Sequence, residues 1–161
     1  MPTAYDVPPD VLISRLAKYL RQQFPEIKPP EWAIYVKTSS DRERPPAERD
    51  WWYTRCASIL RKIYLHGPLS IKDLQSEYGG RKKRRVAPGH HVDAGSSIIR
   101  HVLHQLEAAG LVEKTPRGRV VTSKGRSVVD AVSTEIFEEM VKSDPELAKI
   151  TGAGGNELGS A

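Results

Sequence analysis

The chain has 161 residues, a net charge of +5 and 39% hydrophobic residues, which is enough for one domain with a hydrophobic core and some appendages. A single cysteine, Cys56, excludes an internal disulfide and a cysteine-cluster zinc site, and indicates a cytoplasmic protein. No apolar run approaches the roughly 20 residues of a membrane-spanning helix and no signal-peptide pattern begins the chain, so we expect no membrane partner.

The first predicted element is a helix over residues 10–24, which Asp10 can cap. Its apolar stripe consists of Val11, Leu12, Leu16, Leu20 and Phe24. Prolines at 25, 29 and 30 stop it, and residues 31–36 form a short helix or extended piece that packs Trp32 inward. Residues 38–48 read as a polar, proline-punctuated loop. We interpret residues 1–49 as a helical extension packed on the main domain.

A second helix is predicted over residues 50–65. Its inward face is formed by Trp52, Cys56, Ile59, Leu60 and Ile63, which follow the helical repeat. The sequence His66-Gly67-Pro68 ends it. A short helix over residues 71–77 should follow, with Ser70 as its cap and Asp73 in the acidic position of a capping box.

A third helix is predicted from residue 95 or 96 to residue 109. It would bury Ile99, Val102, Leu103 and Leu106, and Gly110 is a good terminator. Residues 111–114 and 119–122 then read as two short strands joined by a turn at residues 116–118. Ser123 opens a last helix that extends to about residue 140.

The order of these elements predicts the fold class, which is mainly α with a small β-hairpin. Three helices, a hairpin and a closing helix describe a winged helix-turn-helix domain over residues 50–142. Residues 143–161 read as an acidic, glycine-rich flexible tail. From Val132 onward six acidic residues stand against two lysines, a net charge of −4, which leaves about +9 for residues 1–131. A basic body of this kind favours nucleic acid as the partner.

The densest charge follows the short helix. After Gly79-Gly80 come five consecutive cations, namely Arg81, Lys82, Lys83, Arg84 and Arg85. They lie on a connection between two predicted helices, so this sequence predicts a mobile basic loop whose natural counterpart is phosphate. A second basic cluster surrounds the hairpin turn, at Arg117, Arg119, Lys124 and Arg126. Such clusters are often only solvated surface, but two on one small domain favour a continuous phosphate-binding track.

Several short motifs, spread over residues 1–140, have a familiar combination. These motifs are Met1-Pro2, Pro30-Glu31-Trp32, Val36-Lys37, Asp50-Trp51-Trp52-Tyr53-Thr54-Arg55, Tyr64-Leu65, Tyr78-Gly79-Gly80-Arg81 and the helix exit over residues 100–112. Together they resemble protein nineteen of the small ribosomal subunit, an archaeal and eukaryotic family. The resemblance implies a winged helix in the head of the subunit, ribosomal RNA and neighbouring subunit proteins as partners, and a part in subunit assembly. The chain departs from the family in the unbroken run of five cations and in the glycine-rich end from Gly152.

The second helix carries further candidate RNA-binding residues. Trp51, Arg55 and Lys62 form a stripe separate from the apolar face, and an arginine near an aromatic ring suits RNA. The alternative is that Trp51 covers the N-terminal extension and Arg55 is a structural anchor. Lys62 adds only a point charge. The resemblance implies RNA contacts for Arg55 and Arg61.

The third helix and the histidines are less specific. Arg100 could be a single phosphate contact on a solvated face, and the resemblance implies that it faces RNA. The helix is poorly equipped to read base edges, since it has one arginine and one glutamine. His90 and His91 can contact RNA or simply belong to a polar loop. With His101 and His104 they lack a cysteine nearby, so we expect no metal and no cofactor.

The complete set of predicted RNA-binding residues is Trp51, Arg55, Arg61, Lys62, Arg81, Lys82, Lys83, Arg84, Arg85, His90, His91, Arg100, Arg117 and Arg119. Cys56 lies on an apolar face, which predicts a buried, neutral thiol. Because no acid, base and nucleophile come together, we predict neither an enzyme nor a small-molecule substrate. Two alternatives remain: a winged-helix DNA-binding transcription regulator, and a module whose basic loop binds an acidic protein.

Overall fold

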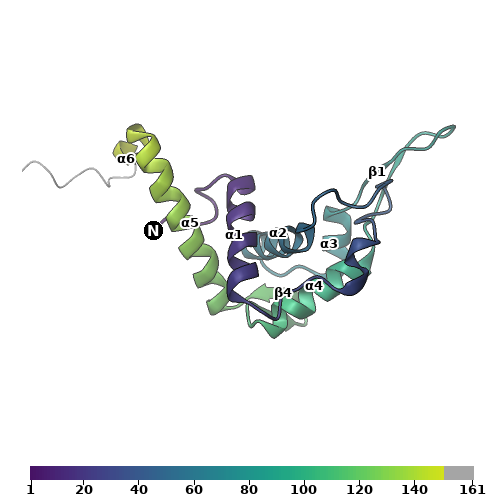
Figure 1. Ribbon diagram of the computed structural model, residues 1–161, viewed down its shortest axis with the longest axis horizontal. Helices are drawn as coiled ribbons and strands as arrows, with labels where there is room; N and C mark the ends of the chain where they lie inside the picture. The colour runs from purple at the N-terminus through teal and green to yellow at the C-terminus, as the bar shows by residue number, and fades with distance from the viewer. Residues whose placement is uncertain (151–161) are drawn as a thin grey trace, which may run out of the picture.

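The computed structural model describes residues 1–150, and the predicted tail beyond residue 150 lies outside them (Figure 1). In chain order the elements are α1 (Pro9–Gln23), the 3-10 helix η1 (Glu31–Ile34), α2 (Trp51–His66), α3 (Ile71–Glu77), β1 (Gly80–Lys82), β2 (His90–Val92), α4 (Ser96–Ala108), β3 (Val112–Thr115), β4 (Gly118–Val121), α5 (Ser123–Ser143) and α6 (Pro145–Ile150). The predicted fold class, mainly α with a small β-hairpin, is confirmed.

The core is built around α2. The predicted inward face, Trp52, Cys56, Ile59, Leu60 and Ile63, has no exposed surface, and α1, α4, α5 and β4 all pack on the helix. Trp52 has no exposed surface, and its indole Nε1 donates a hydrogen bond to Oε1 of Gln105 on α4 (2.8 Å). Nε2 of Gln105 in turn donates to the carbonyl of Lys28 (2.8 Å), which ties the segment after α1 to the core. A buried indole N–H needs such a partner, because an unpaired donor costs about 1–3 kcal/mol.

The short-range signals for α3 are confirmed in detail. The amide of Asp73 donates to the hydroxyl of Ser70 (3.2 Å), and the amide of Ser70 donates to the Asp73 carboxylate (2.8 Å). This is the reciprocal capping box that the sequence predicts.

At the first helix the expectation was wrong: α1 begins at Pro9, so Asp10 lies inside the first turn and makes no cap, and Val11 is 40% exposed. The proline fixes φ at the helical value and so starts the helix.

The predicted hairpin is present as β3 and β4. The strands pair antiparallel, with Val112 opposite Val121 and Thr115 opposite Gly118. Gly118 has φ +140°, and a Cβ there would lie 2.7 Å from the carbonyl of Leu69, because the chain before α3 pairs with β4 at this point. Only glycine suits that position. The arrangement of α2, α3, α4 and this wing is consistent with a winged-helix fold.

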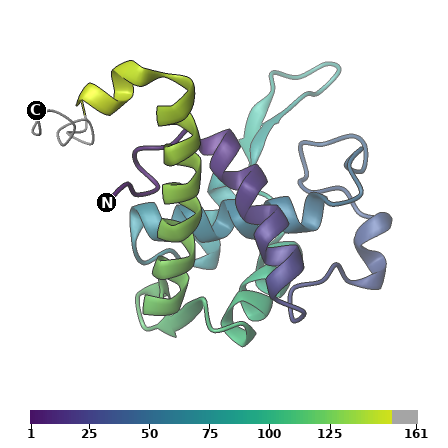
Figure 2. The ribbon, with the colours of Figure 1, turned by 60° about the vertical axis from the view of Figure 1, so that its left-hand side comes forward.

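The predicted basic loop is the main difference from expectation. Residues 80–92 form a second antiparallel hairpin, in which Arg81 is opposite His91 and Lys82 is opposite His90. Figures 1 and 2 show it projecting from the body as a narrow ribbon. A run of charged residues between helices has a weak strand signal, so the sequence pattern indicated a loop.

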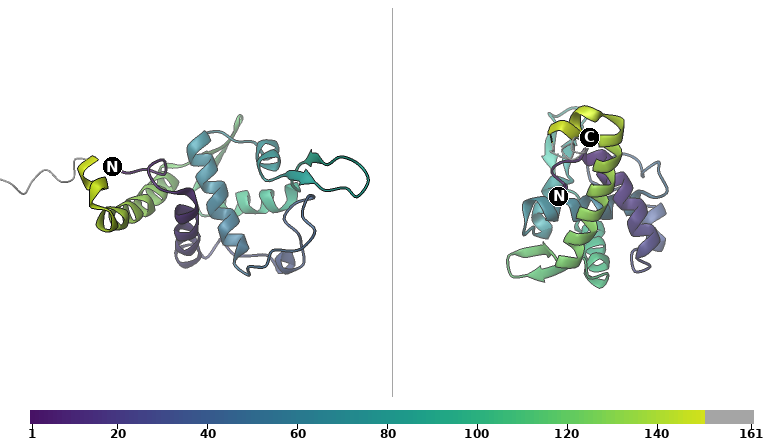
Figure 3. Two further views of the ribbon diagram at one scale, coloured as in Figure 1. Left: turned by 90° about the horizontal axis from the view of Figure 1, so that it is seen from above. Right: turned by 90° about the vertical axis from the view of Figure 1, so that its left-hand side faces the viewer.

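The molecule is elongated, with β1–β2 at one end and α5 with α6 at the other (Figures 1 and 3). α5 lies across α1, and Arg15 of α1 makes a bidentate contact to Glu139 of α5 (3.1 and 2.7 Å). The short α6 was not predicted. Within residues 1–150 no helix is both long and apolar enough to cross a membrane.

Candidate nucleic-acid interface

The cations of the β1–β2 hairpin are exposed and uncompensated. Arg81, Lys82, Lys83, Arg84 and Arg85 all have exposed side chains. Within the described part of the chain none of the five forms an ion pair with a carboxylate. Among residues 1–150, the only hydrogen bond of their charged groups joins Arg81 Nε to the carbonyl of Gly89 (3.2 Å), across the ribbon. Directly opposite residues share a face, so each face of the ribbon carries a cation and a histidine, His91 or His90.

The base of the hairpin is fixed by a close approach of two loops. A Cβ at Gly80 would lie 2.5 Å from the carboxylate of Asp41, so a larger residue there would displace that side chain. Asp41 also accepts a hydrogen bond from the hydroxyl of buried Ser39, which lowers the pKa of its carboxyl. The loop before α2 is thereby held beside the basic ribbon.

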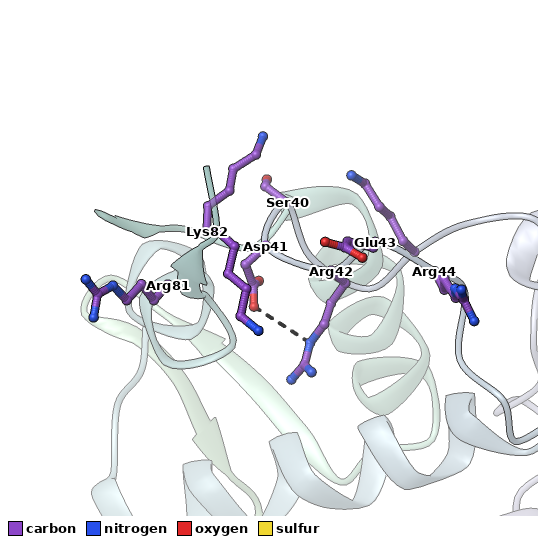
Figure 4. A pocket seen from close by; sticks show the side chains of 9 residues that line it. Ser40, Asp41, Arg42, Glu43, Arg44, Arg81 and Lys82 are labelled. Atoms are coloured by element: carbon purple, nitrogen blue, oxygen red, sulfur yellow. Dashed lines mark ion pairs between the residues drawn. The ribbon is translucent and has the colours of Figure 1, made fainter. Parts of the chain in front are cut away.

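This juxtaposition creates a basic hollow that we call the hairpin–loop hollow. It has a volume of about 700 Å³, and its cations are Lys37, Arg42, Arg44, Arg81, Lys82 and Lys83. Ser40, Asp41 and Glu43 complete the lining, and Asp41 is paired with Arg42 (3.7 Å, Figure 4). The sequence prediction missed Lys37, Arg42 and Arg44, because interspersed acids keep the charge of this loop near neutral. Only the tertiary contact with the hairpin reveals them as part of a basic surface.

Arg55 lies at a second hollow, the Arg55 hollow, of about 480 Å³. Its guanidinium stacks on the ring of Tyr78 at 4.1 Å, and the hydroxyls of Tyr78 and Ser58 are 2.6 Å apart. Burial lowers the pKa of Arg55, which has no carboxylate partner among residues 1–150. Trp51 is 9% exposed, lines this hollow and packs edge-on against Trp52 (5.5 Å). Trp51 and Arg55 are therefore neighbours, as their stripe on α2 predicts.

The other two candidates on α2, Arg61 and Lys62, lie outside the Arg55 hollow. Lys62 pairs with Glu77 (2.9 Å), so its charge is compensated within the chain. Arg61 is half-buried, and its Nε is shielded from solvent without a hydrogen-bond partner in the described residues. The structure does not bring these two into the hairpin–loop hollow.

On α4 the exposed face is partly covered. Arg100 is exposed. The next residue, His101, contacts the Ser97 carbonyl through Nδ1 (2.7 Å) and packs edge-on against Trp32 of η1 (5.1 Å). Gln105 is occupied by Trp52 and Lys28. The helix therefore offers a DNA groove very few free groups.

The wing lies apart from the basic hairpin. β1–β2 precedes the N-terminal end of α4 and the wing follows its C-terminal end, so a helix of 13 residues, about 20 Å long, separates them. Arg117 is exposed at the wing turn. Arg119 is 12% exposed and pairs with Glu107 (3.0 Å), so it is a structural contact within the domain. The hairpin cations thus share a hollow with the loop before α2 and not with the wing, and a continuous phosphate-binding track over both basic clusters stays a prediction.

The histidines of the described residues do not form a metal-binding cluster. His91 lies 3.4 Å from Asp93, which is also paired with Lys72 (2.6 Å). Among residues 1–150 no three His, Cys, Asp or Glu side chains are grouped so that they could hold a metal ion. Burial raises the pKa of the Cys56 thiol far above its usual range, so the thiol is neutral.

Comparison with known proteins gives a consistent result. The family model described as ribosomal protein S19e matches residues 3–139. The small ribosomal subunit protein eS19 of Aeropyrum pernix is 50% identical over 92% of this chain and 99% of its own. The protein of the same name from Thermoplasma acidophilum is 41% identical, covering 89% and 95%, and that of Haloarcula marismortui is 42% identical, covering 92% and 99%.

Proposed function

The chain belongs to the ribosomal protein S19e family, whose members are structural proteins of the small ribosomal subunit, and on this premise we propose that it holds folded ribosomal RNA in the head of that subunit. Its partners are then ribosomal RNA and neighbouring subunit proteins, and it contributes to assembly of the subunit. The observation that carries the proposal is the hairpin–loop hollow, with six cations from two segments facing one space.

The chemistry of this surface suits structured RNA. Three of its six cations are arginines, which bind phosphates bidentately, and all six are presented on a ribbon and a loop of one folded domain. Double-stranded RNA is recognised by its shape and backbone, because its deep major groove is inaccessible to side chains. A ribbon carrying unpaired cations on both faces can lie between two phosphate strands.

The proposal leaves Lys62 and Arg119 with structural roles and retains Arg55, Arg61, Arg100, Arg117 and the two hairpin histidines as RNA contacts.

The DNA-binding alternative has less support. A transcription regulator reads base edges with its third helix, but Gln105 is occupied in the core and His101 is packed on Trp32.

The opposite end of the molecule is suited to a protein neighbour. Exposed acids, including Glu135, Glu138 and Glu146, are carried by α5 and α6, which lie at the opposite end of the molecule from the hairpin. Phosphate would be repelled there, so we propose that this end contacts a basic segment of another subunit protein.

The test is to replace residues 81–85 by serine in the full chain and to follow its sedimentation with small subunits in lysate. Because these side chains are exposed, thermal unfolding should be nearly unchanged, while the variant should be lost from small subunits. The matched control replaces five other exposed cations, Lys18, Lys28, Arg49, Lys142 and Lys149, by serine, and removes the same net charge. The control should sediment with the subunit. Full retention of the hairpin variant, or equal loss of both variants, would contradict the proposal.

A further inference from the structure

The Arg55 hollow combines two kinds of surface. Its cations are Arg42, Arg44 and Arg55, and its apolar wall is formed by Ile13, Pro45, Pro46, Trp51 and the Tyr78 ring. Its volume of about 480 Å³ falls within the range of sites that bind small ligands, about 300–1,000 Å³. A simple anion would use the cations alone, and a simple hydrophobic group would use the wall alone.

Arg55 is the central group of this hollow. One face of its guanidinium is stacked on Tyr78, and its N–H groups form no hydrogen bond to any described residue. Burial penalises a guanidinium that has no acidic partner, and stacking on Tyr78 offsets only part of that cost. An occupant that supplies an anionic oxygen recovers that loss. Tyr78 is itself held by Ser58, so the stacked pair is already in position before anything binds.

The hollow also communicates with the proposed RNA track. Arg42 and Arg44 line both the hairpin–loop hollow and the Arg55 hollow. A polyanion lying along the hairpin would therefore pass the mouth of the Arg55 hollow without leaving the arginines. This continuity favours a group that is covalently part of the same strand over an independent small molecule.

We propose that the Arg55 hollow receives one unstacked nucleotide of the bound ribosomal RNA, with its phosphate on the arginines and its base against the apolar wall. Unpaired bases in RNA are recognised in this way, by stacking on aromatic side chains and arginine planes. Glu48 on the rim can accept a hydrogen bond from an amino group of the base. This inference rests on the proposed function, because it needs RNA on the hairpin.

The first test fills the hollow without changing any charge. Thr54 is exposed on α2, lines the hollow and bonds only weakly to the Asp50 carbonyl (3.5 Å). Thr54→Phe should weaken binding of the full chain to transcribed small-subunit ribosomal RNA about tenfold, as expected when one stacked base is lost. The matched control, Ser127→Phe, adds an exposed phenylalanine on α5 away from the hollow and should bind within twofold of the natural chain.

The second test asks directly whether a base is recognised. AMP, ribose 5-phosphate and inorganic phosphate are titrated onto the full chain while the indole N–H signals of Trp51 and Trp52 are followed by NMR. AMP should shift the Trp51 signal at about tenfold lower concentration than ribose 5-phosphate, and Trp52, bonded to Gln105, should not respond. Equal concentrations for AMP and inorganic phosphate would overturn the inference in favour of a bare anion site.

The two proposals fail in different ways. If the serine hairpin variant loses RNA while Thr54→Phe binds normally, the proposed function stands and the nucleotide site is wrong. If neither variant changes RNA binding, the proposed function fails together with the inference.

Discussion

Tyr78 is the residue on which the α2 surface depends. It ends α3 and precedes the two glycines that begin the basic hairpin. Its ring lies under Arg55 at 4.1 Å and near the Lys62 ammonium at 5.4 Å, and its hydroxyl contacts Ser58 on α2. One aromatic side chain at the end of α3 therefore contacts three residues of α2, including the arginine of the Arg55 hollow.

This position predicts a loss of stability in alkali. Burial raises the pKa of Tyr78 to about 12, opposed in part by its hydrogen bond with Ser58 and by the charge of Arg55. Burial, together with a hydrogen bond to Asp130, likewise raises the pKa of Tyr64 to about 12. An unfolded tyrosine loses its proton near pH 10, so between about pH 10 and 12 the folded state binds more protons and the free energy of unfolding falls as pH rises.

Urea unfolding at pH 8, 10 and 11 measures this effect. We expect the contribution of Tyr78, about 1–2 kcal/mol after allowing for partial exposure, to be complete below pH 10 and to decline above it. Tyr78→Phe should be less stable at pH 8, because it lacks the hydroxyl contact, but its decline with pH should be shallower. A decline as steep as that of the natural chain would show that Tyr78 does not keep its proton in the folded state.

At the scale of elements, Gly118 shows how closely the wing packs against the chain before α3. β4 begins at Gly118, where φ is +140° and the Leu69 backbone lies within van der Waals reach of any added Cβ. Gly118→Ala should lower the free energy of unfolding by about 2–3 kcal/mol, since the substitution combines backbone strain with a clash against backbone that cannot shift easily.

A matched substitution separates this from a general cost of alanine. Gly95, the residue before α4, has φ −64° and no atom within 4 Å of an added Cβ. Gly95→Ala should change stability by less than about 1 kcal/mol in either direction. Thermal or urea unfolding of both variants provides the comparison, and equal destabilisation would mean that the wing tolerates a Cβ at Gly118.

The sequence predicts elements well where the signal is local. The capping box of Ser70 and Asp73, the glycine at 110 and the turn at 116–118 each depend on a few adjacent residues, and the corresponding elements are present. The strands β1 and β2 could not be found in this way. Arg81, Lys82 and the paired histidines have little strand preference, and the hairpin packs beside the Asp41 loop, which is distant in sequence.

The candidate site likewise contains residues that local sequence predicts and residues that only tertiary contacts bring together. The five hairpin cations are conspicuous as a run, and the neighbourhood of Trp51 and Arg55 follows from helical spacing. By contrast, Arg42 and Arg44 are diluted by acids in the sequence and become part of the basic surface only because two loops meet. Arg119 shows the converse, since its place in a basic cluster gives no sign of its half-buried pair with Glu107.

On the scale of the whole molecule, charge is separated along the long axis. The five unpaired cations of residues 81–85 lie together at the hairpin end, while the exposed acids of α5 and α6 lie at the other end (Figure 1). Such a distribution orients the protein as it approaches a polyanion, with the hairpin leading and the acidic helix facing away. The attraction is therefore carried by one end, which can be tested with salt.

The RNA-binding constant should fall steeply with ionic strength, and the steepness should depend on the number of hairpin cations. The eight cations of the hairpin and its neighbouring loop, if each neutralises one phosphate, give a slope of log K against log salt of about −6 to −7. Replacing residues 81–85 by serine leaves three of these cations and should reduce the slope to about −2 to −3.

As a control, the double variant Glu135→Gln and Glu138→Gln alters charge at the far end and should keep the natural slope, because screening confines its effect to about 10 Å. Filter binding to transcribed small-subunit ribosomal RNA from 50 to 400 mM salt measures all three. An unchanged slope in the serine variant would mean that phosphates are bound elsewhere on the domain.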